Sequence, residues 1–317
     1  MKNYADKEYL HTRIYAMRGR LLRLRDYNAL LREQEGLVEK TAEAHRMTIS
    51  GKEALFREQI RDVLNLAEAT AYHAPLFMAF LRRYEARNLK LLLAKAFDRS
   101  VAEQWYDIGR FAILDRGLLD EKLTPKTIER MLTDTWLDGL FRGSVNYDHL
   151  LIRLDRLTLA RMLDCAAFLD RDDAAFLREI IFMRAAVSMT AWKWRLTINY
   201  GWEYGRATAY GNIANDLMED GPARFIVTVE RQLDRDLEEL KKQTGSEPGA
   251  QDIEHHLEQY YYRWIRHVFY RDFHSICCVA AYLWLLGRQI QNMFVIFEGL
   301  RFRLPHEDIL ERIISET

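Results

Sequence analysis

Apolar side chains recur every three or four positions through most of the chain, which is the spacing of one face of an α-helix. The same period predicts helices over residues 52–73, 75–98, 148–169, 173–197 and 251–271. Near the N-terminus one apolar stripe predicts a single long helix, and its positions are Leu10, Ile14, Met17, Leu21, Leu24 and Leu31. No sustained stretch alternates apolar and polar residues with β-branched side chains, so we expect an all-α protein without a sheet.

Residues that break helices are scarce, with 5 Pro and 15 Gly in 317 residues. Thr124 followed by Pro125 predicts a helix N-cap and the first helical residue. Asp115-Arg116-Gly117 predicts a turn, and residues 243–249 are the most loop-like segment of the chain. Long helices joined by few loops are the expected result.

One helical pattern occurs twice: an aromatic-Leu pair, a polar step, an Asn and then an apolar run. The first copy covers residues 80–93 around Asn88, and the second covers residues 282–297 around Asn292. The two Asn are 204 residues apart, so half that spacing predicts a middle copy near position 190. Residues 176–194 fit there, although Val187 stands in place of the Asn. A repeat of about a hundred residues predicts three similar helical units.

Composition indicates a globular protein, since 49% of residues are hydrophobic and 29% are charged. The net charge of −1 gives no reason to expect a nucleic-acid partner. Residues 2–25 are locally basic, with seven Lys or Arg against two acids. They form either a solvated helix face or a docking surface for an acidic partner or lipid headgroups.

The three cysteines (Cys165, Cys277 and Cys278) are expected to be buried reduced thiols, because no CxxC pair occurs. The charged N-terminus predicts no signal peptide. The most apolar stretch, Ile276–Leu286, is too short to cross a bilayer.

Signatures of catalysis and of cofactor binding are weak. No phosphate-binding Gly-rich loop, dinucleotide fingerprint or nucleophile elbow occurs. Two acid–His pairs, at Glu8 with His11 and at Asp252 with His255, do not complete a di-metal pattern, so we expect no metal and no cofactor.

Residues 212–220, with Asp216 and Glu219, resemble the second acidic motif of squalene and phytoene synthases. The first motif lacks a good counterpart, since residues 170–173 lie too near. Two alternatives remain open: an isoprenoid synthase and a generic helical scaffold.

Several segments in order resemble the C subunit of V/A-type ATPases, called subunit d in eukaryotic V-ATPases. They are Tyr9–Leu22 with its Arg-rich turn, Asp26-Tyr27 before Leu30-Leu31, Thr41–His45, Phe80-Leu81, Glu85–Lys90, and Tyr282 with Gln289–Asn292. The resemblance extends from residue 9 to about residue 312. Two departures mark a divergent member: Gln289 replaces an expected acid, and Val187 replaces the Asn of the middle copy.

The resemblance implies a funnel of three helical lobes with pseudo-threefold symmetry, divided near residues 1–142, 143–222 and 223–317. It implies a non-catalytic rotor subunit at the cytoplasmic face of a membrane, peripheral through protein contacts. Its partners would be central stalk subunits of the D and F types and the membrane proteolipid ring, which carries protons or sodium ions.

Four residues of the family motif, Glu85, Asn88, Gln289 and Asn292, are expected to be structural. Each Asn is expected to hydrogen-bond a neighbouring helix end. Arg13, Arg18 and Arg20 are candidates for partner contacts, and the alternative is that they pair with neighbouring acids.

Overall fold

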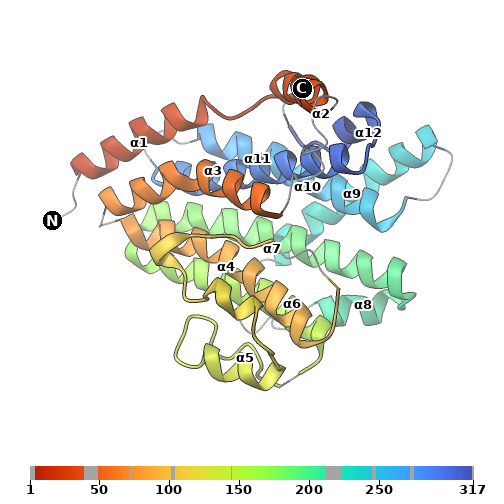
Figure 1. The fold of residues 1–317 in the computed structure, drawn as a ribbon, viewed down its shortest axis with the longest axis horizontal. Helices are drawn as coiled ribbons and strands as arrows, with labels where there is room; N and C mark the ends of the chain where they lie inside the picture. Colours follow the sequence, from red (N-terminus) through yellow and green to blue (C-terminus); the bar gives the residue numbers. More distant parts are fainter. Residues whose placement is uncertain are drawn as a thin grey trace. The chain divides into compact units, whose positions relative to one another are not determined.

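The structure is a computed structural model that describes residues 4–38, 49–70, 73–100, 104–143, 145–211, 223–244, 248–271 and 275–315. These residues form α-helices and short 3-10 turns, with no strand among them, which confirms the all-α prediction (Figure 1). The α-helices are α1 (Tyr4–Arg18), α2 (Leu24–Val38), α3 (Ile49–Ala69), α4 (Ala74–Ala96), α5 (Pro125–Leu132), α6 (Tyr147–Asp164), α7 (Arg171–Tyr200), α8 (Tyr204–Gly211), α9 (Ala223–Thr244), α10 (Ala250–Arg271), α11 (Cys277–Arg301) and α12 (His306–Glu311). The 3-10 turns are η3 (Gly109–Phe111), η4 (Arg116–Leu119) and η5 (Cys165–Phe168). None of the described helices combines the length and the apolar character that crossing a bilayer requires.

The chain divides into two compact units. The first comprises Met1–Leu91, Val101–Ala112 and Trp264–Thr317, and the second comprises Leu92–Ser100 and Ile113–Arg263. Both units are therefore assembled from separated stretches of sequence. The arrangement of three lobes, with boundaries near residues 142 and 222, stays a prediction.

The first unit is organised around α11, which contacts α1, α2, α3 and α12. Tyr27 and Leu31 of α2 form one buried cluster with Ile296 of α11 and Ile309 and Ile313 near the C-terminus. Gly299 permits the close approach of α12, because a Cβ added there would lie 2.5 Å from the Ile309 side chain.

The single N-terminal helix predicted from the apolar stripe is wrong, because the chain forms two helices there. Residues 19–23 make a turn in which the Gly19 N–H donates to the Tyr15 carbonyl at 3.1 Å. The Asp26 carboxylate then accepts a hydrogen bond from the Arg23 N–H at 2.8 Å and so begins α2. The apolar stripe nevertheless continues across the turn at residues 19–23, since Met17 before it and Leu31 after it are both buried.

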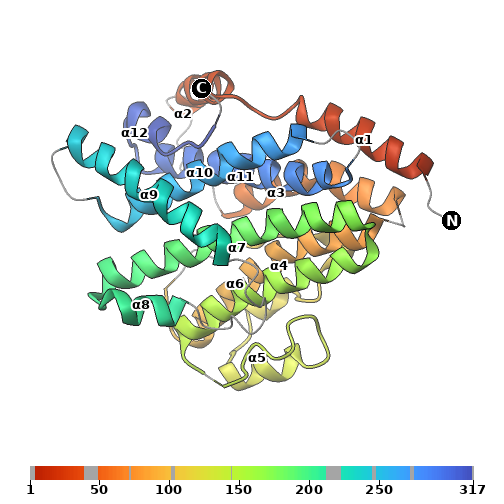
Figure 2. The same ribbon diagram turned by 180° about the vertical axis from the view of Figure 1, so that it is seen from behind.

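The second unit is organised around α7, which contacts α6, α8 and α9 (Figure 2). Asp170 caps the start of α7 by accepting from the Asp173 N–H at 3.0 Å. The predicted cap of α5 is confirmed, since the Thr124 side chain accepts from the Thr127 N–H and Pro125 occupies the first turn. Cys165 and Cys278 are buried free thiols, as predicted.

The three long helices that carry the sequence repeat end alike. Just beyond α4, α7 and α11, a residue with left-handed backbone follows an aromatic residue: Asp98 (φ 52°), Gly201 (φ 63°) and Arg303 (φ 54°). Such a residue closes a helix by turning the chain back across its last carbonyls. The middle copy, which lacks the Asn, therefore shares the ending of the other two.

Hydrogen bonds confirm the similarity of these helix ends. The Arg99 N–H donates to the Ala94 carbonyl at 2.8 Å, and the Leu304 N–H donates to the Gly299 carbonyl at 2.9 Å. Both bonds join residues five positions apart, as in the Schellman motif. After α7 the corresponding bond, from the Trp202 N–H at 3.3 Å, spans one residue more.

Candidate functional site

Asn88 lies fully buried in α4 and clamps the backbone of a non-helical segment that follows the helix. Its Nδ2 donates to the Tyr106 carbonyl at 2.9 Å, and its Oδ1 accepts from the Tyr106 N–H at 2.8 Å. A segment outside helices and sheets needs other partners for the polar backbone groups that it buries. The side-chain amide supplies one donor and one acceptor in a single group.

The Glu53 carboxylate reinforces this first clamp. Glu53 of α3 is buried and accepts from the Trp105 N–H at 3.1 Å. Glu85, one helical turn before Asn88, is also fully buried. The Tyr106 ring packs edge-on against Phe56, with ring centroids 5.1 Å apart. The segment is thus held by its backbone and by its side chain.

Asn292 of α11 makes a second clamp of the same design. Its Nδ2 donates to the Ile314 carbonyl at 2.7 Å, and its Oδ1 accepts from the Ile314 N–H at 3.2 Å. The expected partner of each Asn was a helix end, and for Asn88 that expectation is wrong, because Tyr106 lies outside the helices, whereas Ile314 directly follows the last turn of α12. In both copies the partner is a non-helical residue later in the chain, 18 residues after Asn88 and 22 residues after Asn292.

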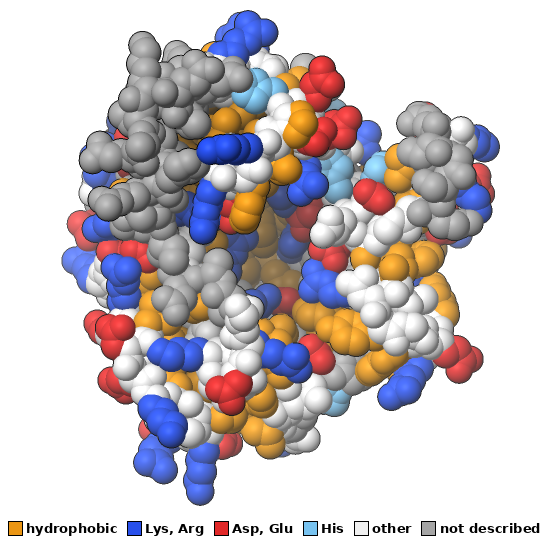
Figure 3. Space-filling view, turned by 45° about the vertical axis from the view of Figure 1, so that its right-hand side comes forward, with side chains coloured by type: hydrophobic (Ala, Val, Ile, Leu, Met, Phe, Trp, Pro, Cys, Tyr) orange, Lys and Arg blue, Asp and Glu red, His pale blue; other side chains and the backbone are white. Residues whose placement is uncertain are grey.

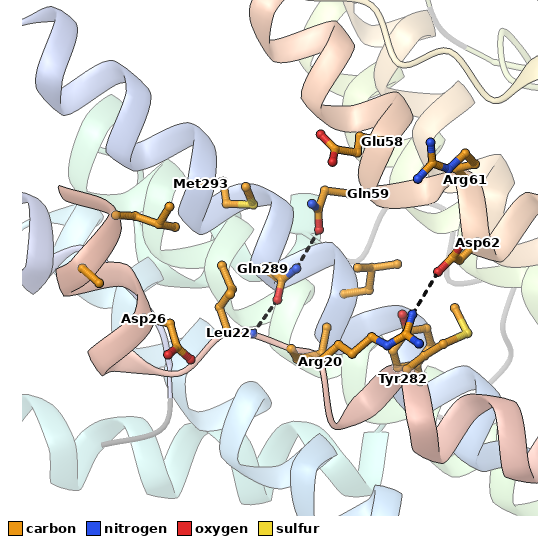
Figure 4. A pocket seen from close by; sticks show the side chains of 15 residues that line it. Arg20, Leu22, Asp26, Glu58, Gln59, Arg61, Asp62, Tyr282, Gln289 and Met293 are labelled. Carbon is orange, nitrogen blue, oxygen red and sulfur yellow. Dashed lines mark hydrogen bonds and ion pairs between the residues drawn. The ribbon is translucent and has the colours of Figure 1, made fainter. Parts of the chain in front are cut away.

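Gln289 occupies in α11 the position that Glu85 has in α4, three residues before the Asn. Its Oε1 accepts from the Leu22 N–H at 2.7 Å, and its Nε2 donates to Oε1 of Gln59 at 2.7 Å (Figure 4). The amide therefore joins α11 to α3 and to the turn between α1 and α2. Gln289 thus uses both its acceptor and its donor here, at a position where an acid was expected.

A groove of about 630 Å³ lies over this amide. Its floor is one face of α11, where Tyr282, Leu286, Gln289 and Met293 follow at helical spacing. The remaining lining residues come from α1, α2, the turn between them, and α3: Met17, Arg20, Leu21, Leu22, Asp26, Ala29, Leu30, Glu58, Gln59, Arg61 and Asp62. The groove thus has a largely apolar floor and a charged rim.

Charges at the rim are mostly solvated. Arg20 and Asp62 face each other at 3.6 Å, and both side chains are exposed (Figure 4). Such a pair contributes little to stability. Burial in the floor raises the pKa of Tyr282, and the Asp62 carboxylate raises it further, so the Tyr282 hydroxyl stays protonated at neutral pH.

The three candidate contact arginines have different surroundings. Arg13 is exposed on α1. The Arg18 guanidinium lies over the rings of Phe269 and Tyr270, at 5.9 and 6.0 Å from their centroids. Arg20 is the member of this set that lines the groove. On the face in Figure 3, basic and acidic side chains are interspersed, which agrees with the balanced composition.

Within the described ranges, no three His, Cys, Asp or Glu side chains gather as metal ligands would. His11 contacts the Ser275 carbonyl at 3.0 Å, and His255 contacts Gln259 at 2.7 Å. The acidic segment 212–220 and the segment Thr41–His45 lie outside the described residues.

A sequence model of the family described as ATP synthase (C/AC39) subunit matches residues 10–312. The chain belongs to this family. The match covers nearly all of the 317 residues of this chain, and it confirms the resemblance to a subunit of the V/A-type ATPases. No curated protein matches the chain.

In this member of the C/AC39 family, sequence reasoning located both asparagines but missed the residues that Asn88 and Gln289 hold. The partners of Gln289 lie 230 and 267 positions away, and backbone groups carry no residue-specific signal. The groove was missed for the same reason, since its walls come from distant parts of the chain.

Proposed function

We propose that this C/AC39 subunit is a rotor part that couples the central stalk to the membrane proteolipid ring. ATP hydrolysis in other subunits turns the stalk, and this subunit passes the rotation to the ring, which carries protons or sodium ions. It catalyses no reaction itself, and it is peripheral at the cytoplasmic face. Membership of the C/AC39 family over residues 10–312 is the observation that supports this proposal most directly.

The buried clamps are consistent with transmitting torque. A coupling body must not yield locally when stalk and ring pull on it, and loosely attached segments are the first to open. Here the segments that follow α4 and α11 are each fixed by two hydrogen bonds from a buried Asn. Each bond contributes about 1 kcal/mol net, and leaving the buried groups unpaired would cost more.

Arg13, Arg18 and Arg20 are proposed contacts for the stalk or the ring. Arg13 and Arg20 are exposed, and the exposed pair of Arg20 with Asp62 can exchange partners at little cost. The groove that Arg20 lines offers an apolar floor beside these charges.

A pulldown of the tagged full chain from membranes of its own source, followed by mass spectrometry, tests the proposal. We expect stalk subunits of the D and F types and the proteolipid subunit in near-stoichiometric amounts. The charge reversals Arg13→Glu and Arg20→Glu should lower that recovery, and Arg130→Glu, at an exposed position of α5, is the matched control. Absence of all three partners, from membranes that contain them, would refute the rotor assignment.

A further inference from the structure

One end of the second unit gathers exposed large apolar side chains. Val145 precedes α6, Ile198 and Tyr200 end α7, and Tyr204 begins α8. Their exposed fractions are 60%, 39%, 53% and 52%. Figure 2 shows α8 beside the C-terminal part of α7. We call these four residues, with Phe97, Tyr147 and Trp202, the aromatic end.

Contacts within the aromatic end show that it is one surface. The rings of Phe97 and Tyr147 lie 5.5 Å apart. Burial and the Asp148 carboxylate raise the pKa of Tyr147, and Tyr200 adds a smaller effect in the same direction, whereas Arg99 opposes it. The helices that carry these residues pack together, since α7 contacts both α6 and α8.

Tyr204 is held in place although its ring is exposed. The buried Lys193 ammonium donates to the Tyr204 hydroxyl and also pairs with Glu230 of α9. The Trp194 ring contacts the Tyr204 ring edge-on at 6.4 Å. A ring fixed in this way loses little conformational entropy when it is covered.

Two arginines border the aromatic end. Arg99 lies over the Tyr147 ring at 5.8 Å, and Arg206 lies over the Trp202 ring at 4.2 Å, and both arginines are exposed. Acidic neighbours are Asp98, Asp148 and Glu203. Asp148 is in the first turn of α6 and Glu203 directly precedes α8, where helix N-termini offset negative charge. The surface is therefore amphipathic and has no strong net charge.

We propose that the aromatic end rests on a phospholipid bilayer, with its rings among the headgroups and its arginines near the phosphates. Tyr and Trp concentrate at membrane–water interfaces because one part of the ring is apolar and another is polar. Arginine can keep its guanidinium among phosphates while its stem covers apolar surface. The exposed side chains stand at helix ends and not in a cavity, so they do not suit a small ligand. This contact with lipid goes beyond the proposed function, whose membrane contacts are with proteins.

Flotation of the purified full chain with protein-free vesicles tests the proposal. One vesicle is phosphatidylcholine alone, and the other contains a third phosphatidylserine. We expect wild type to float with both, because attachment depends on rings more than on net charge. The variant I198S/Y200S should bind about tenfold more weakly, equivalent to ~1.4 kcal/mol.

Phe168→Ser is the matched control, because Phe168 is 66% exposed and lies in η5, at the opposite end of the α6–α7 pair. It should float like wild type, and thermal unfolding should show that both variants remain folded.

Failure of wild type to float, or equal loss of vesicle binding in both variants, would overturn the proposal. So would binding only to the anionic vesicles that disappears in high salt, since that result would assign attachment to basic residues. Loss of I198S/Y200S from the assembled complex without any lipid binding would assign the surface to a protein partner. The pulldown with the wild-type chain does not depend on vesicle binding, so failure here is distinct from failure of the rotor assignment.

Discussion

Asn88 and Asn292, 204 positions apart, each use both polar atoms of one amide to hold both backbone groups of one later residue. The repeat in the sequence thus corresponds to a repeated structural arrangement. A long helix ends in a left-handed turn, the chain returns along it, and a buried amide fixes the return.

Replacing either clamp with a carboxylate should be costly. In Asn292→Asp a carboxylate oxygen would face the Ile314 carbonyl oxygen, which the amide approaches at 2.7 Å. We expect the free energy of unfolding to fall by ~2–4 kcal/mol, and Asn88→Asp should behave similarly. Urea denaturation followed by circular dichroism measures this. Asn199→Asp, on the exposed end of α7, should change stability by less than ~0.5 kcal/mol. Equal effects at positions 199 and 292 would contradict the clamp.

A methyl group at Gly299 should separate α11 from α12. The added Cβ would meet the Ile309 side chain at 2.5 Å, so Gly299→Ala should destabilise by ~1–3 kcal/mol despite the better helix propensity of Ala. In Gly205→Ala of α8, no neighbouring atom lies within 4 Å, so that variant should be neutral or slightly more stable. Adding Ile309→Val to Gly299→Ala should recover part of the loss. Absence of any recovery would mean that the strain lies elsewhere.

Stability should depend more on a long polar side chain at position 289 than on the N–H donor of Gln289 alone. Gln289→Leu leaves the Leu22 N–H and the Gln59 amide without this partner, and we expect a loss of ~1–3 kcal/mol. Gln289→Glu should cost less, because the Gln59 amide can turn and donate to the carboxylate. A double-mutant cycle of Gln289→Leu with Gln59→Leu should show coupling above ~0.5 kcal/mol. Additive effects would show that the two amides act independently.

Sequence periodicity predicted the helices well, because apolar spacing and caps such as Thr124-Pro125 are local signals. It failed at residues 19–23, where the apolar stripe continues across a turn. The left-handed helix ends at Asp98 and Arg303 could not be predicted from a glycine, because neither position is Gly. The groove and the bridge of Gln289 depend on residues more than 200 positions apart, and no local pattern encodes such pairings.

The buried ion pair of Lys193 with Glu230 should respond unequally to loss of each partner. The Lys193 side chain is 5% exposed and that of Glu230 is 32% exposed. Glu230→Leu leaves an ammonium in the core and should cost ~3–5 kcal/mol, whereas Lys193→Met leaves a carboxylate that water can reach and should cost less. Urea unfolding of both variants measures the difference. A larger loss for Lys193→Met would contradict the burial that the structure shows.

Arg156 of α6 should make stability depend on pH in the alkaline range. Burial lowers the pKa of its guanidinium to about 10, whereas the Asp155 carboxylate acts in the opposite direction. Above that pH the folded chain has released a proton that the unfolded chain still holds, so this group's contribution to stability rises with pH. At neutral pH burial of the charge disfavours the folded state, and the hydrogen bond from its Nη1 to the Ala185 carbonyl at 3.2 Å offsets part of that cost. Arg156→Met keeps the volume and should change stability by less than ~1 kcal/mol at neutral pH, whereas Arg156→Ala should lose ~3 kcal/mol to a cavity.

The free energy of unfolding of wild type should rise relative to that of Arg156→Met as the pH rises from about 8 to about 11, and urea titrations across that range measure it. The comparison with Arg156→Met removes the titration of other groups that both proteins share. A gap between the two proteins that is constant with pH would show that Arg156 keeps its proton in the fold, and that its charge is better compensated than burial alone implies.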